Sequence, residues 1–346
     1  MENNFIVSTS PYIRASINTR KIMLHVIAAL APITIYSVVI HGLSALWVLM
    51  ASVAGALLGE LVMEKGRRLP VTLADCSALL TGLLLALTLP PLLPWWIALI
   101  AGLSATILGK QMFGGIGHNL FNPALVGRAV VFVSWPAFFD AGYAKSVAIG
   151  IANTATHKSI QSMVDVANGA SPLLAMKHVY DPSNPLWAGQ VPRGLFGSIY
   201  YKPLLFANPW GCLGEVSALL LILGGIYLVA TRVIDWRIPV VYVGSMVALT
   251  AVIGRDPLFY TLAGGLLIGA IFMATDYTTS PLARNGKIVY ALGLGLVTWL
   301  LRGWSNNPEG VMFAILFMNA LVPLIDRYIL PSRYGKMKES EEVVPA

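Results

Sequence analysis

The sequence contains few charged residues, and this shortage limits what the protein can be. Only 11% of its 346 residues are Asp, Glu, Lys or Arg, whereas 57% are hydrophobic. A water-soluble domain of this composition could not cover its apolar surface. Apolar runs of about 20 residues recur along the chain, which is the length that a helix needs to cross a bilayer core. We therefore predict an all-α polytopic membrane protein in contact with the lipid bilayer.

Ligand motifs are also scarce. The two cysteines, Cys76 and Cys212, are far apart and give neither a disulfide framework nor a metal cluster, and the five histidines lack ligand spacing. The net charge of +7 comes from basic residues beside apolar runs, so we expect no nucleic-acid binding. Motifs that bind NAD or iron–sulfur clusters are absent from the sequence.

Ten apolar runs are candidate membrane spans, of which the third is too short to cross the bilayer core alone. They cover residues 22–40, 43–63, 76–89, 94–109, 123–139, 212–230, 238–253, 257–274, 287–301 and 311–330. A long hydrophilic segment separates five spans from five, so the second half is inverted relative to the first. Weak internal landmarks, such as Asn122-Pro123 and Asn307-Pro308, fit an inverted repeat with discontinuous helices.

Basic residues in short loops predict the orientation. The short loops of one side hold only Arg255 and Arg302, so the other side is taken as cytoplasmic. It collects Arg14, Arg20, Lys21, Lys65, Arg67, Arg68, Lys110, Arg232, Arg237, Arg284, Lys287, Arg327, Arg333, Lys336 and Lys338. Five regions follow: a cytoplasmic N-terminus (1–21), a first five-helix repeat (22–139), an extracytoplasmic segment (140–211), a second repeat (212–330) and a cytoplasmic tail (331–346).

The stretch 113–122 is too rich in glycine and polar residues for a lipid-facing helix, yet too apolar for an ordinary loop. Non-helical backbone of this kind is tolerated at membrane depth only where it is buried in protein or lines a cavity. Asn122 is predicted to cap the following helix, with Pro123 at its first position.

Four stretches together resemble the NqrB/RnfD family of flavin-carrying membrane subunits in ion-translocating electron-transfer complexes. They are residues 114–125, 272–276, 319–327 and the central 165–171. The short N-terminus and total length are more similar to the RnfD branch. The resemblance implies a bacterial inner membrane, with the central segment on the periplasmic side. It also implies other Rnf-type membrane subunits and iron–sulfur and flavin subunits as partners, and a flavin transferase for maturation.

The resemblance implies that FMN is attached through its phosphate to the hydroxyl of Ser171. Asp165, Asn168, Gly169 and Ala170 complete the attachment motif, although Val166, Asn168 and Ser171 replace the residues usual in the family. Asn168, Gly169 and Ala170 supply the flexibility that a transferase substrate needs. The alternative is that Ser171, which precedes Pro172, only caps a helix. Both roles are compatible, because a helix N-terminus stabilises a phosphate.

A second flavin, riboflavin held non-covalently, is implied near Asn119 and Asn122. The alternative is that these amides only satisfy broken backbone. Arg128 is costly in a bilayer, so it should face the interior, where it could hold a flavin or pair with an acid such as Asp75. Asp276 and Thr278, where the eighth span ends, are candidates for an ion path.

Two classes of function remain open. The first is a redox subunit, not catalytic alone, that relays electrons through flavins between ferredoxin and NAD, coupled to sodium or proton translocation. An NqrB-like subunit of a sodium-pumping NADH:quinone reductase is its close alternative. The second class is a small-solute channel or transporter, which inverted repeats with broken helices would also suit.

Overall fold

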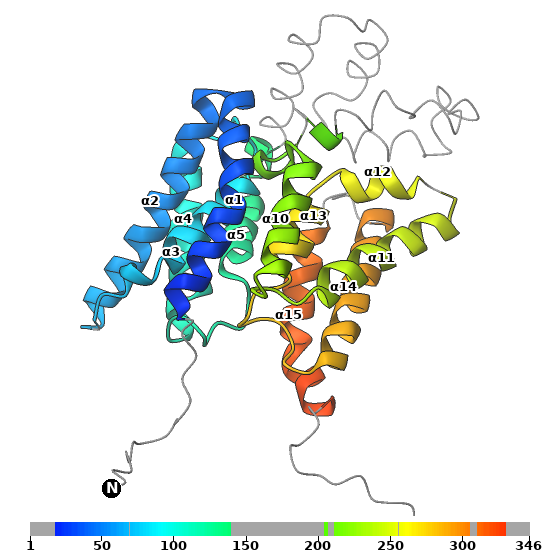
Figure 1. Cartoon of the computed structure of the whole chain (residues 1–346). Helices are drawn as coiled ribbons and strands as arrows, with labels where there is room; N and C mark the ends of the chain where they lie inside the picture. Colours follow the sequence, from blue (N-terminus) through cyan, green and yellow to red (C-terminus); the bar gives the residue numbers. More distant parts are fainter. Residues whose placement is uncertain are drawn as a thin grey trace, which may run out of the picture.

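The computed structural model describes residues 18–68, 70–139, 204–206, 211–254, 256–304 and 310–329, and these ranges contain helices and turns without a strand. Two groups of helices lie side by side (Figure 1). In the first group α2 lies along α4, α3 contacts both, and α4 packs on α5. Its members are α1 (Thr19–His41), α2 (Leu43–Gly66), α3 (Ser77–Leu87), α4 (Trp95–Gly109) and α5 (Pro123–Ser134).

The second group contains the helices that follow residue 217. In it α11 packs against α14, and α14 against α15, while α1 and α10 join the two groups. Its members are α10 (Ala218–Ala230), α11 (Arg237–Val252), α12 (Pro257–Leu262), α13 (Leu266–Ile268), the π-helix η4 (Gly269–Met273), α14 (Arg284–Trp304) and α15 (Val311–Tyr328).

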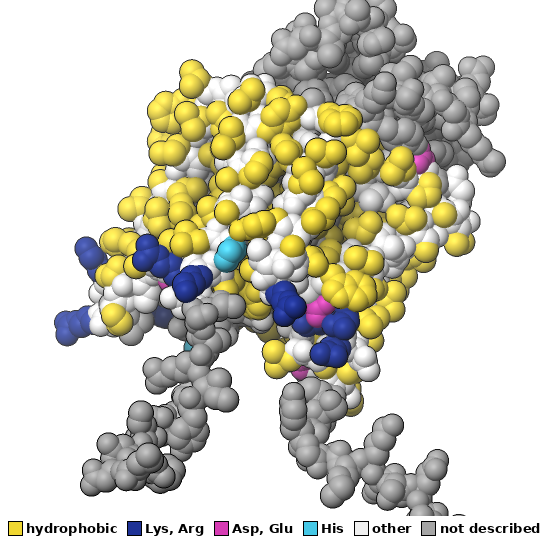
Figure 2. All heavy atoms as spheres, viewed as in Figure 1, with side chains coloured by type: hydrophobic (Ala, Val, Ile, Leu, Met, Phe, Trp, Pro, Cys, Tyr) yellow, Lys and Arg dark blue, Asp and Glu magenta, His cyan; other side chains and the backbone are white. Residues whose placement is uncertain are grey.

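Four helical stretches are long and apolar enough to cross a membrane: Thr19–His41, Leu43–Gly66, Trp95–Phe113 and Val311–Tyr328. Several shorter apolar helices accompany them. Figure 2 shows hydrophobic side chains over most of the visible face and Lys and Arg side chains gathered toward one end. We call this the basic end; α1 begins there at Thr19, next to Arg20, and α11 begins there at Arg237. The protein is a multi-pass membrane protein.

Helical elements occupy each expected apolar range, but three boundaries differ. The range 123–139 stops being one helix at Ser134, because Trp135 precedes Pro136 and a residue before proline disfavours the helical conformation. The range 212–230 becomes an α-helix only at Ala218, where the Ser217 hydroxyl accepts from the N–H of Leu220. The range 257–274 is interrupted between Leu262 and Leu266.

The interruption of this eighth range is held by a buried arginine. Gly264 takes a φ of +71°, which a residue with a side chain rarely adopts. The Arg302 guanidinium donates to the carbonyl groups of Tyr260 and Ala263, which the end of α12 leaves without helical partners. Assigning Arg302 to an outer loop was therefore wrong: it lies on α14, and its side chain is buried.

Glycines allow α2 and α4 to pack with their backbones in close contact. A Cβ added at Gly55 would clash with the Leu99 carbonyl group, and one added at Gly102 would clash with the Ser52 carbonyl group. Close approach through small residues is the usual basis of helix association in membranes, where lipid tails remove the hydrophobic driving force between helices. The packing of α2 on α4 fixes the first group of helices.

We expect Gly102→Ala to lower the free energy of unfolding by about 1–3 kcal/mol, the usual cost of overpacking. Gly244→Ala is the matched control, because a Cβ at this α11 position meets no atom within 4 Å. The measurement is the midpoint of thermal unfolding in detergent. Equal midpoints for the two variants would contradict the packing argument.

Candidate functional site

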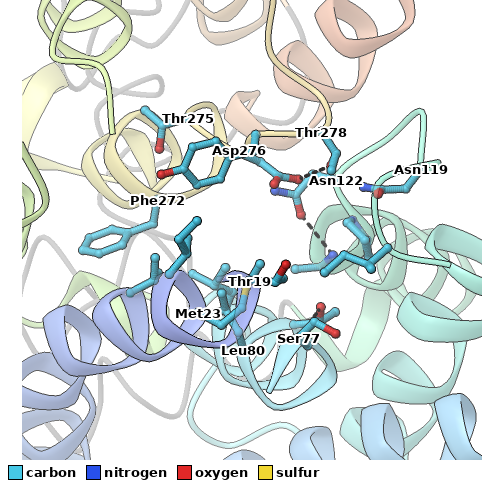
Figure 3. Close-up of a pocket in the computed structure, with 18 of the residues that line it drawn as sticks. Thr19, Met23, Ser77, Leu80, Asn119, Asn122, Phe272, Thr275, Asp276 and Thr278 are labelled. Carbon is cyan, nitrogen blue, oxygen red and sulfur yellow. Dashed lines mark hydrogen bonds between the residues drawn. The ribbon is translucent and has the colours of Figure 1, made fainter. Parts of the chain in front are cut away.

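A cavity of about 340 Å³ lies between the two groups of helices, on the side of the basic end. Figure 3 shows its walls, which come from α1, α3, the segment before α5 and the segment around η4. Most of the lining is apolar and includes Met23, Leu80 and Phe272. Its polar side chains include Ser77, Lys110, Asn119, Asn122, Thr275, Asp276 and Thr278.

Asn122 joins the two walls of this cavity. Its Oδ1 accepts from the N–H of Ala124 at 3.0 Å, so it caps α5 as predicted, with Pro123 at the first helical position. Its Nδ2 donates to the Met273 carbonyl oxygen at 3.2 Å, at the end of η4 in the other half of the chain. One buried amide therefore supplies hydrogen-bond partners to backbone groups in both halves of the chain, at the start of α5 and at the end of η4.

Asn319 on α15 completes this connection. In the amide orientation that satisfies all its neighbours, its oxygen accepts from the N–H of Asn122 at 3.1 Å. Its nitrogen, which has two hydrogens to donate, then lies within hydrogen-bonding distance of three acceptors: the Thr279 carbonyl group, the Tyr290 hydroxyl and the Ile315 carbonyl group. The side chain is fully buried. The two asparagines thus connect α5, η4, α14 and α15.

Asn119 is buried at the edge of the cavity, and its Nδ2 donates to the Phe121 carbonyl oxygen at 3.2 Å. The preceding glycines explain how the chain reaches this position, because Gly114, Gly115 and Gly117 all have φ values between +90° and +115°. The segment from 111 to 122 is not an α-helix, in agreement with the sequence analysis.

The side chains of Asp276 and Thr278 lie beside that of Asn122 (Figure 3). The Asp276 Oδ2 accepts from the Thr278 hydroxyl at 3.1 Å and from the Thr279 hydroxyl at 3.4 Å. The structure thus brings together two groups of residues that sequence analysis had assigned to different tasks, a flavin site and an ion path. They are about 150 residues apart in the chain, since Asn122 and Met273 are separated by 151 positions.

Arg128 lies apart from this cavity. It is buried in α5, and its guanidinium donates to the Cys212 sulfur at 3.6 Å. Cys212 precedes Leu213, whose N–H bonds to the carbonyl of Leu89 just beyond the end of α3. Asp75 lies before the other end of α3, where it accepts from the N–H of Ser77. The structure therefore does not bring Arg128 and Asp75 together.

Five predicted attachment residues lie outside the described residues: Asp165, Asn168, Gly169, Ala170 and Ser171. The described ranges also contain no group of three or more His, Cys, Asp or Glu side chains that could hold a metal ion.

Sequence reasoning missed the buried charges beside the cavity. Lys110, which we had counted among the basic residues of the cytoplasmic loops, is only 3% exposed. Its ammonium forms an ion pair with Glu60 of α2 and a hydrogen bond with Ser77. Glu60, in the middle of an apolar run, was the available signal, because an ionisable residue inside a membrane span is a functional candidate by default.

The cavity suits a flat, partly polar molecule. Its volume falls within the range of about 300–1,000 Å³ typical of small-molecule sites. Apolar side chains can contact the faces of a ring system, and the amides of Asn119 and Asn122 can bond to heteroatoms on its edge. These residues fit an isoalloxazine ring.

Comparisons with known proteins show the family to which this chain belongs. Residues 6–335 match the family model described as the NQR2, RnfD, RnfE family. The D subunit of the proton-translocating ferredoxin:NAD(+) oxidoreductase complex of Clostridium ljungdahlii is 39% identical over 96% of this chain and 97% of its own length. Its sodium-translocating counterpart from Acetobacterium woodii is 38% identical over 99% and 98%. The D subunit of the ion-translocating oxidoreductase complex of Stutzerimonas stutzeri is 38% identical over 96% of each chain. This chain belongs to the NQR2, RnfD, RnfE family.

Proposed function

We propose that this chain is the D subunit of an Rnf-type complex, which relays electrons between ferredoxin and NAD and couples them to sodium or proton translocation. The cavity between Asn122 and Asp276 carries the proposal, because it offers a flavin site inside the membrane part of a protein without metal-binding clusters in its described residues. The names of the three relatives favour this function over quinone reduction or solute transport. The chain acts with other membrane, iron–sulfur and flavin subunits.

Two flavins would carry the electrons. Riboflavin would occupy the cavity non-covalently, between the apolar walls and beside Asn119 and Asn122, and would supply one- and two-electron chemistry. FMN would be attached by a flavin transferase to Ser171 through a phosphate ester. The chain's own residues bind and orient the ring, exclude water from it and hold the two helix groups together. Asp276 and Thr278 place a carboxylate and a hydroxyl beside the ring, where a cation or proton would pass.

The proposed topology has ten spans in two inverted repeats, with both termini and the basic end in the cytoplasm. In support, α1 begins at the basic end, where its second residue is Arg20, whereas α10, the first helix of the second group, ends there at Ala230, close to Arg232. A reporter that is active only outside the cytoplasm should be active when fused near Lys158 and silent when fused after Lys338. The opposite pattern would place Ser171 in the cytoplasm and refute this topology.

Ser171→Ala should abolish the flavin fluorescence that survives denaturation in a gel, because only the acceptor oxygen is lost. Ser171→Thr is the matched control and should keep the band, since threonine offers the same nucleophilic oxygen. Intact-protein mass spectrometry of the parent chain should show one FMN adduct. A Ser171→Ala chain that remains fully fluorescent would refute attachment at this residue.

Replacing Asn119 and Asn122 together with Leu should lower the non-covalent flavin extracted per chain and leave the Ser171 band unchanged. The matched control is Ser217→Ala, which removes an equally buried cap from α10 without touching the cavity. Each change removes one helix cap, at about 0.5–2 kcal/mol, and the double replacement also leaves the Met273 carbonyl group without its partner, at about 1–3 kcal/mol.

If the asparagines only support backbone, their replacement leaves buried groups unpaired at about 1–3 kcal/mol each. Yield and both flavins would then fall together. This result, or an unchanged content of extractable flavin, would contradict the assignment of the cavity.

A further inference from the structure

The positive charge nearest the cavity belongs to Lys110. Among the described residues that line the cavity, Lys110 is the only Lys or Arg and Asp276 the only Asp or Glu, and they come from opposite walls. The Lys110 side chain is 4% exposed and the Glu60 side chain 0%. Surface screening by salt therefore does not weaken this charge as it would weaken one on the protein surface.

The two partners of the ion pair lie at different distances from the cavity. Lys110 lies at the end of α4 and reaches the cavity together with Ser77, whereas Glu60 on α2 does not line it. The Glu60 Oε1 forms the ion pair with the Lys110 ammonium and also accepts a hydrogen bond from the Gln111 side-chain amide at 3.3 Å. The second oxygen, Oε2, is buried without a hydrogen-bond partner among the described residues. The cation thus faces the cavity with its counter-charge behind it.

A buried ion pair usually adds little to the free energy of unfolding, because desolvation opposes the attraction between the charges. Removing two charges from water costs several kcal/mol per ion, and replacing such a pair with apolar residues of similar volume is often neutral or stabilising. Glu60 and Lys110 lie 50 positions apart on different helices, and packing through Gly55 and Gly102 already holds these helices together. Fold stability therefore does not explain the pair.

We propose that Lys110 sets the reduction potential of the flavin in this cavity and that Glu60 moderates its effect. This inference rests on the flavin assignment of the cavity proposed above. A cation held in a low-dielectric site favours whichever oxidation state of a neighbouring group carries more negative charge, which for a flavin is the reduced one. Lys110 acts as a positioning residue: it exchanges no electrons and raises the midpoint potential through its field. The carboxylate of Glu60, which is farther away, lowers it by a smaller amount.

The test is a redox titration of the non-covalent flavin in the purified full chain, in a Ser171→Ala background that removes any covalent flavin signal. Lys110→Met should shift the midpoint to more negative values, and Glu60→Gln should shift it to more positive values. The midpoint potential of the double variant should lie between those of the parent and of Lys110→Met, because the double variant loses both the nearer and the farther charge. Lys110→Arg, which keeps the charge, should stay close to the parent.

Opposite shifts in the single variants distinguish this role from a structural one, which would lower flavin content in both without an ordered change in midpoint. Leaving one buried charge unpaired is strongly destabilising, so the single variants can fail to assemble. The double variant then decides, because it leaves no charge unpaired. If the midpoint potential of the double variant is equal to or above that of the parent, the proposed role of Lys110 is refuted, while the flavin assignment of the cavity still stands. A parent chain without extractable flavin would overturn the assignment of the cavity, and the role of Lys110 with it.

Discussion

Backbone groups inside a membrane protein must find partners within the protein, because lipid offers none. In this chain the requirement is most demanding where helices are interrupted, before α5 and after η4, and both interruptions are satisfied by the Asn122 amide. Asn319 adds the bond to the N–H of Asn122 and extends the connection to α14 and α15. The cavity exists because these two breaks meet: unbroken helices would pack side chain against side chain and leave little space between the two groups.

The buried polar side chains around these interruptions have different roles. Amide side chains bond to the interrupted backbone, as those of Asn122 and Asn319 do. Among the buried charges, Arg302 caps the interrupted helix α12 and Lys110 faces the cavity. A charge that caps a helix stabilises the fold, whereas the Lys110–Glu60 pair stabilises it little. The electrostatic field of the cavity is therefore a property that the chain can set without altering its packing.

Sequence patterns predicted the positions of the helical elements and the cap at Asn122, because apolar run length and an Asn-Pro pair act locally. They also identified Asn119, Asn122, Asp276 and Thr278, but as two unrelated sites. Only the packing of η4 against the start of α5 brings these residues together, and no local signal encodes a contact across 151 positions. Lys110 and Arg302 were misplaced for a related reason: each lies at or near a helix end, where sequence alone does not distinguish a solvated charge from one folded back into the protein.

The central claim is that a flavin ring occupies the cavity between Asn122 and Asp276. Its most direct test is a density map from electron cryo-microscopy of the purified complex, at a resolution that separates ring systems from lipid. The account predicts a flat density between the walls formed by Leu80 and Phe272, with its polar edge within hydrogen-bonding distance of Asn119 or Asn122. A cavity filled by an acyl chain or by a side chain of a partner subunit would contradict it.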